Sequence, residues 1–156
     1  MLKLIHPVAG LIGFLTILTF STSTVLSELS GSLDAIAAVK LAIPWGLLIL
    51  APALIVTGAS GFQIAGASSN GWILAKKRRM PFIAANGVVI LIPCALYLAS
   101  LAAQRAFGAL FYEVQAVELV AGAVNLILMA MNIRDGLRLT GRLAARADEN
   151  PGRSRP

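Results

Sequence analysis

The stretch VQAVELVAGAVNLILMAMNIRDGLR, residues 114–138, decides the fold that this chain can adopt. It is largely apolar and long enough to cross a bilayer, which takes about 20 residues of helix. Polar residues of this stretch, together with one glycine and one methionine, recur every three or four residues, so they share one helical face. That face, called the stripe below, consists of Gln115, Glu118, Gly122, Asn125, Met129 and Asn132. Because polar groups are costly in lipid, we expect the stripe to face other helices or a second subunit.

The composition indicates that the whole chain is an integral membrane protein. Of its 156 residues, 58% are hydrophobic and 13% are charged, and the mean hydropathy is +0.82. A soluble domain of this length does not need so apolar a chain. The expected fold is all-α, an integral membrane four-helix bundle formed by one domain, residues 1–147. The net charge of +6 comes from basic residues at the ends of apolar segments, which favours a lipid bilayer as partner and not nucleic acid.

The apolar runs predict four membrane spans, at about residues 7–26, 41–58, 82–103 and 114–134. Ser27–Lys40 and Gly58–Gly71 are expected to be connections, the second following a frayed helix end. Prolines inside the second and third spans predict kinks. The aromatic residues before the last span are expected at the lipid interface: Phe107, Phe111 and Tyr112. Residues 148–156 form a polar tail that we expect to be disordered.

The basic residues predict the orientation of the bundle. With four spans, both termini and the middle connection lie on one side, which carries 11 of the 13 Lys and Arg residues. The other side has only Lys40 and Arg105. By the positive-inside rule, both termini are expected to be cytoplasmic.

His6, the only histidine, lies at the cytoplasmic end of the first span, with Gly10 and Gly13 on the same helical face. Imidazole is a common axial ligand of haem iron, and small residues beside it leave room for a flat macrocycle. Small residues equally allow two helices to approach closely, and a single terminal histidine also suits an interfacial or capping role.

Two methionines, Met80 and Met129, are expected at a similar depth to His6, and a thioether can be the second haem ligand. Either methionine could equally be a core residue. Three arginines at the same level could pair with haem propionates, although the orientation rule also accounts for them. They are Arg79, Arg134 and Arg138.

Glu118 and Asn125 are expected inside the membrane, where an ionisable group suggests a proton relay, an ion site or a partner for a cation. Only Lys40 and Arg105 are expected on the same side as Glu118. The alternative is a protonated Glu118 bonded to Gln115 or to a hydroxyl group of the first span. Asp135 is expected to form a surface ion pair with its neighbouring arginines.

Three segments, HPVAG (6–10), RMPFIAANG (79–87) and NIRDGLRLTGR (132–142), look like those of small bacterial inner-membrane proteins. That group resembles dimeric four-helix transmembrane b-type cytochromes. The resemblance implies a homodimer in a bacterial cytoplasmic membrane that binds haem b through His6 and transfers electrons. Since the chain has one histidine, the second ligand would be Met129, Met80 or His6 of another subunit. The alternative function is a small transporter, channel or assembly subunit without haem, which would use the stripe around Glu118 and Asn125.

Overall fold

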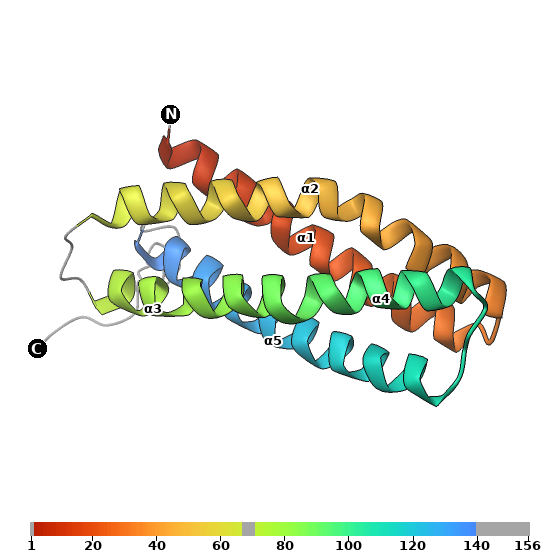
Figure 1. Ribbon diagram of the computed structural model, residues 1–156. Helices are drawn as coiled ribbons and strands as arrows, with labels where there is room; N and C mark the ends of the chain where they lie inside the picture. The colour runs from red at the N-terminus through yellow and green to blue at the C-terminus, as the bar shows by residue number, and fades with distance from the viewer. Residues whose placement is uncertain (1, 67–70, 140–156) are drawn as a thin grey trace, which may run out of the picture.

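The computed structural model describes residues 2–66 and 71–139, which are helical apart from short connections (Figure 1). The elements are α1 (Leu2–Leu29), α2 (Leu33–Ala65), α3 (Gly71–Asn86), a π-helical turn η1 (Gly87–Leu91), α4 (Ile92–Ala103) and α5 (Ala109–Leu139). Because α3, η1 and α4 follow one another without a break, the chain forms four rods. The expected tail at 148–156 lies outside the described residues.

Each rod contains a segment that is long and apolar enough to cross a membrane: Leu4–Leu29, Leu33–Ile64, Arg78–Ala103 and Ala109–Arg138. The expectation of an all-α fold with four helices long and apolar enough to span a membrane is therefore confirmed, and these four candidate spans indicate a multi-pass membrane protein. The two tight connections, residues 30–32 and 104–108, lie at the same end of the bundle, called the short-loop end below (Figure 1). The beginning of α1 and the end of α5 lie at the opposite end, called the terminal end.

The helices are longer than the apolar runs suggest, so the predicted connection Ser27–Lys40 is wrong and the predicted connection Gly58–Gly71 begins later than expected. Ser27–Lys40 is mostly helical: α1 continues to Leu29 and α2 begins at Leu33, with the Ser32 hydroxyl accepting the Ala35 N–H (3.3 Å) as a helix cap. The segment after Gly58 also remains helical up to Ala65. The helix ends there because Gly66 adopts a positive φ of 45°, which a glycine tolerates.

The helix geometry changes from α-helical to π-helical just before Pro93. A proline has no N–H, and its ring crowds the carbonyl group four residues earlier. The backbone widens over η1, where the Ile92 N–H bonds to the Gly87 carbonyl group five residues earlier. Gly87 is buried, and a Cβ there would lie 3.9 Å from Nδ2 of Asn125. The widened turn thus adjoins the stripe of α5.

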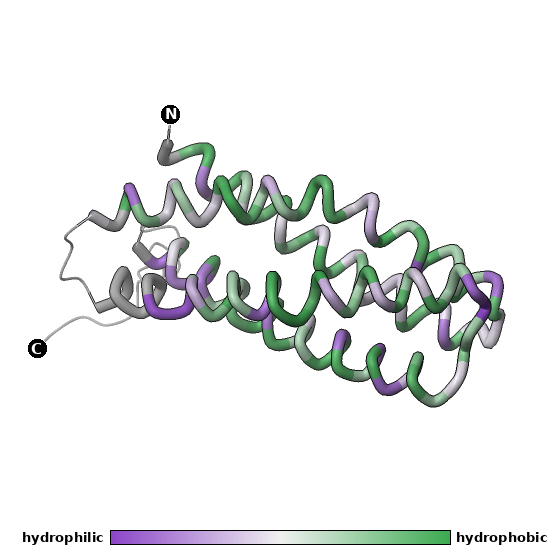
Figure 2. The backbone as a smooth tube through the Cα atoms, in the orientation of Figure 1, coloured by the Kyte–Doolittle hydropathy of each residue, from purple (hydrophilic) through white to green (hydrophobic). Residues whose placement is uncertain are grey.

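The outer surface of the bundle is strongly apolar (Figure 2). Large side chains such as Trp45 and Val120 are 74% and 66% exposed, as a lipid-facing surface requires. Two apolar clusters lie inside. The one at the short-loop end consists of Ile36, Ala37, Leu98, Ala102 and Phe111, and the one further along the bundle, called the apolar layer below, of Ile17, Leu50, Ile83 and Met129.

Phe111 is not an interfacial aromatic residue. Its side chain is fully buried in the cluster at the short-loop end and packs edge-to-face against Phe107, with ring centroids 5.0 Å apart. Tyr112 also packs edge-to-face against Phe111 but is 43% exposed, which is consistent with the interfacial position predicted for it. Phe111 is buried because α5 begins at Ala109, earlier than expected, and the ring points into the bundle.

Candidate functional site

The stripe of α5 faces the inside of the bundle. Gln115, Asn125 and Met129 are buried, whereas Val120 and Ile127 on the opposite face are at least 60% exposed. This is the orientation that the helical spacing predicts. The stripe contacts α1 on one side and the rod formed by α3, η1 and α4 on the other.

In the half of the bundle nearer the short-loop end, Lys40 of α2 forms an ion pair with Glu118 of α5. The Lys40 side chain is 1% exposed, and its ammonium group also donates to the Thr24 hydroxyl of α1 (3.3 Å). A buried lysine needs such partners because an isolated ammonium group in a low-dielectric interior is costly. Of the roles considered for Glu118, the structure favours that of a partner for a cation, which is Lys40.

Gln115 does not bond to Glu118. Its Nε2 atom donates instead to the Glu28 carboxylate of α1 (2.6 Å). The sequence reasoning missed Glu28, because it assigned that residue to a polar connection. Its spacing of four residues from Thr24 is a signal that both lie on one helical face.

Near the middle of α5, Asn125 is fully buried and bonds to Asn86 of α3. The Asn86 amide donates to the Asn125 Oδ1 atom and to the Ala121 carbonyl oxygen, both at 2.8 Å. The Asn125 amide in turn donates to the Ile83 carbonyl oxygen (3.4 Å). These bonds join α3 to α5 next to the widened turn η1, which begins directly after Asn86.

Towards the terminal end, Asp135 forms the expected ion pair with its neighbour Arg134, but its side chain is fully buried and does not lie at the surface. Its main partner is Arg79 of α3, whose guanidinium group donates to the Asp135 carboxylate (2.6 Å) and to the Asn132 side-chain oxygen (3.3 Å). Arg134 lies 3.4 Å from the same carboxylate and is half exposed. Arg138 is exposed at the surface. Arg79 and Arg134, expected beside haem propionates, are therefore engaged with Asp135.

His6 of α1 is held by α2. Its Nδ1 atom lies 3.1 Å from the Thr57 carbonyl oxygen and 3.1 Å from the Ser60 hydroxyl oxygen. The carbonyl oxygen can only accept, and the Ser60 hydroxyl donates to the Val56 carbonyl oxygen (2.5 Å). Both groups therefore favour a proton on Nδ1 of His6, and this tautomer carries a lone pair on Nε2.

Met80 of α3 lies beside His6 at the terminal end. A Cβ built on Gly61 of α2 would lie 2.2 Å from the Met80 Cε atom, 3.3 Å from its sulfur and 2.9 Å from the His6 Cε1 atom. The imidazole and the thioether thus converge on one point of α2, and the absence of a side chain at Gly61 allows it. Nothing in the sequence singled out Gly61, because its importance depends on two other helices.

Gly10, Gly13 and Met129, which were also predicted near His6, do not take part in this contact between His6 and Met80. α2 side chains cover both small residues of α1, since a Cβ on Gly10 would lie 3.5 Å from Thr57 and one on Gly13 would lie 3.1 Å from Leu54. Of the two readings of these glycines, the structure favours close approach of two helices. Met129 belongs to the apolar layer. Its Cε atom would lie 3.6 Å from a Cβ built on Gly13, and Gly13 is about two helical turns further along α1 than His6.

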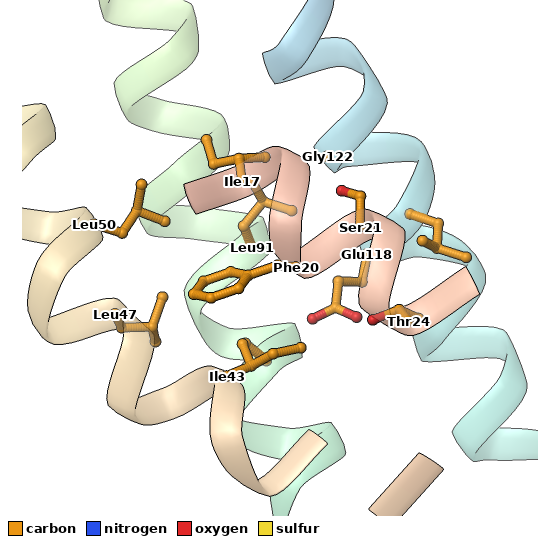
Figure 3. Close-up of a pocket in the computed structure, with 12 residues that line it drawn as sticks. Ile17, Phe20, Ser21, Thr24, Ile43, Leu47, Leu50, Leu91, Glu118 and Gly122 are labelled. Carbon is orange, nitrogen blue, oxygen red and sulfur yellow. The ribbon is translucent and has the colours of Figure 1, made fainter. Parts of the chain in front are cut away.

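A cavity of about 40 Å³ lies between α1, α2, α4 and α5 (Figure 3). Figure 3 shows the carboxylate of Glu118 next to Thr24 at its edge, with the Ser21 hydroxyl further along α1. Its other walls are largely apolar, for example Phe20 and Ile43.

Comparisons with known protein families, with curated proteins and with solved structures give no match for this chain. Among the described residues, no three His, Cys, Asp or Glu side chains come close enough to hold a metal ion by themselves. The function is therefore argued from two features: the donors His6 and Met80 near the terminal end, and the polar cluster around Glu118 nearer the short-loop end.

Proposed function

We propose that this protein is a membrane b-type cytochrome that binds haem through His6 and Met80 and transfers electrons. The observation that carries the proposal is the convergence of an imidazole and a thioether over Gly61. Histidine with methionine is an established pair of axial ligands for haem iron. The donor set fits a metal that arrives within a macrocycle, because such a metal needs only two ligands from the protein.

The surroundings of His6 support its role as a ligand. A histidine that binds a metal usually donates its other ring N–H to a carbonyl or similar oxygen, which fixes the tautomer and the ring orientation. The Thr57 carbonyl and the Ser60 hydroxyl provide this arrangement at Nδ1, so Nε2 would be the ligand atom.

The choice of Met80 over Met129 rests on position. Met80 shares its contact point with His6, whereas Met129 is buried in the apolar layer. The bound group would supply a one-electron redox centre. The residues of this chain would orient it near one membrane surface, where the exposed Arg78 and Arg138 are candidates to bind its propionates. The proposal also includes a homodimer in a bacterial cytoplasmic membrane.

The test is the absorption spectrum of the purified protein after expression with added haem precursor. The wild type should show a Soret band at a stoichiometry near one haem per chain. His6→Ala should lose that band because the imidazole ligand is gone, and Met80→Ala should keep haem but change its ligand spectrum. Met129→Ala removes a thioether of the same kind from the apolar layer and is the matched control, with an unchanged spectrum expected.

Three results would count against this assignment. A colourless wild type, or a full and unshifted Soret band in His6→Ala, would eliminate the cytochrome. An unchanged spectrum in Met80→Ala together with loss of haem in His6→Ala would replace Met80 with His6 of a second subunit as the partner ligand. The reduction potential provides an independent check, because methionine ligation raises it relative to two histidines.

A further inference from the structure

The polar cluster nearer the short-loop end contains more negative than positive charge. It consists of Thr24, Glu28, Lys40, Gln115 and Glu118, so two carboxylates face one ammonium group. The other titratable or charged groups near it do not change this balance. Asp34 and Arg105 pair with each other at the surface, Glu113 is exposed, and the Cys94 thiol of α4 lies within electrostatic reach of both Lys40 and Glu118.

Gln115 bonds to one of these carboxylates, that of Glu28, lies one helical turn before the other, Glu118, on the same face of α5, and has an unused acceptor. Its Oε1 atom is the one buried side-chain oxygen or nitrogen among the described residues that has no hydrogen-bond partner. Exchanging the amide oxygen and nitrogen does not solve this, because Oε1 would then face the Glu28 carboxylate. A buried acceptor of this kind calls for a donor, either a water molecule or a protonated carboxyl group.

The cavity supplies room for water beside the second carboxylate. It has a volume of about 40 Å³ and borders Glu118, Thr24 and Ser21 (Figure 3). A site needs roughly 10–15 Å³ of such volume to hold one water molecule, so there is space beside Glu118 for more than one. Three oxygen-bearing side chains at its edge give the water hydrogen-bond partners.

We propose that Glu28, Gln115 and Glu118 form a proton-binding site that exchanges protons with the compartment at the short-loop end. A carboxylate oxygen takes up one proton from a hydronium ion in the adjoining water: one O–H bond forms, the O–H bond of the hydronium ion breaks, and a neutral water molecule is left. The two carboxylates and the Lys40 ammonium group carry a net charge of one negative unit before this step and none after it, which is favourable in a low-dielectric interior. Lys40 keeps its own proton and stays bonded to Thr24 and Glu118.

The apolar layer limits the path of the proton. Ile17, Leu50, Ile83 and Met129 separate the cluster and Asn125 from the Arg79–Asp135 pair at the terminal end. A proton that reaches Glu118 therefore returns to the same side, and the site responds to the pH of that side without conducting protons across the membrane. The inference shares no residue with the haem proposal and does not depend on it.

The experiment is a pH titration of the glutamate carboxyl groups by ¹³C NMR on the full chain in nanodiscs. The chain has four glutamates, Glu28, Glu113, Glu118 and Glu149, so single Glu→Gln variants can assign every signal. The signals of Glu28 and Glu118 should both follow the same two-step curve in the wild type, because coupled groups share their apparent midpoints. Glu113, on the same helix but exposed, is the internal control and should show one step.

Gln115→Met tests the part of Gln115, because it keeps the shape of the side chain and removes the amide. In this variant Glu28 and Glu118 should each titrate in a single step that does not depend on the other. Independent one-step curves in the wild type, or identical curves in the wild type and Gln115→Met, would overturn the proposal. If the variant does not fold, the wild type decides alone: transfer of magnetisation from water to the Gln115 amide supports the site, and its absence across the titration overturns it.

Discussion

Gly61 controls how closely the His6 and Met80 side chains approach α2, because both lie where its side chain would be. A methyl group there would meet the end of Met80 at 2.2 Å and the imidazole ring at 2.9 Å. The thioether can move, since methionine is flexible, but the ring is held by Thr57 and Ser60. The residue therefore matters to both the packing and the proposed ligand pair.

We expect Gly61→Ala to lower the free energy of unfolding by about 1–3 kcal/mol, as overfilling a packed contact usually does. Under the haem proposal, it also displaces the Met80 sulfur and alters the ligand spectrum. Thermal unfolding in detergent and the absorption spectrum measure the two effects.

Gly58→Ala is the matched control for this substitution, three residues earlier on α2. A Cβ at Gly58 meets nothing within 4 Å, so this variant should be as stable as the wild type or more stable by up to about 1 kcal/mol. Equal melting temperatures for Gly58→Ala and Gly61→Ala would contradict the contact that the structure shows.

At this scale the sequence predicts which side chains point inward but not what they meet. The spacing along α5 is a property of one helix, so the burial of Gln115 and Asn125 follows from it. The partner of Glu118 depends on how α1 and α2 pack beside α5. The sequence left two candidates, Lys40 and Arg105, and the packing of the helices selects Lys40, whose side chain lies inside and completes the ion pair.

The docking of α3 on α5 depends on one buried ion pair and the hydrogen bonds next to it. Arg79 reaches Asp135 and Asn132 at the terminal end, and Asn86 reaches Asn125 seven residues further along α3. Between them lies Ile83 of the apolar layer. The two polar contacts therefore fix the rotation of both helices, which apolar packing alone specifies less well.

We expect Asp135→Asn to destabilise the bundle by about 1–3 kcal/mol, because the buried partner of Arg79 loses its charge while Arg79 keeps its own. The effect falls short of that for a fully buried pair, since Arg79 and Arg134 are partly exposed and screened by solvent. Chemical denaturation in mixed micelles measures it.

Asp34→Asn is the matched control, because it makes the same chemical change in an exposed carboxylate–arginine pair. Asp34 of α2 pairs there with Arg105, which lies in the connection between α4 and α5. Arg105 is 58% exposed and Asp34 itself 81% exposed, so the expected loss is less than about 1 kcal/mol. A larger effect at Asp34 than at Asp135 would show that burial does not set the strength of these pairs.

The number and order of the helices could be predicted from the apolar runs, but their ends could not. Hydropathy marks the part of a helix that lipid surrounds, whereas the helix itself continues as long as its backbone groups bond to one another. This is why α2 begins at Leu33 and not near Leu41, and why α5 already includes Phe111. The ends are set by local features such as the Ser32 cap and the positive φ of Gly66.

For the whole molecule, the structure sharpens the charge asymmetry on which the orientation depends. Two basic residues, Lys40 and Arg105, belong to the half of the bundle nearer the short-loop end and so oppose this asymmetry. Both are paired with carboxylates, Lys40 inside the bundle and Arg105 at its surface. The terminal end carries Arg78, Arg79, Arg134 and Arg138 among the described residues. Among the described residues of this end, these four arginines face one carboxylate, that of Asp135, so net positive charge is concentrated at the terminal end.

We expect the terminal end to be cytoplasmic, because positive charge next to a span is retained on that side during insertion. Fusions that end after Gly66 or Leu139 should make green fluorescent protein fluoresce and leave alkaline phosphatase inactive. Fusions after Gly31 or Gly108, in the two tight connections, should do the opposite. Each site carries both reporters, so a failure to express cannot be mistaken for a location. Active phosphatase after Gly66 would reverse the orientation, and it would then place the His6–Met80 pair at the outer surface and the short-loop end, with its proton-binding site, in contact with the cytoplasm.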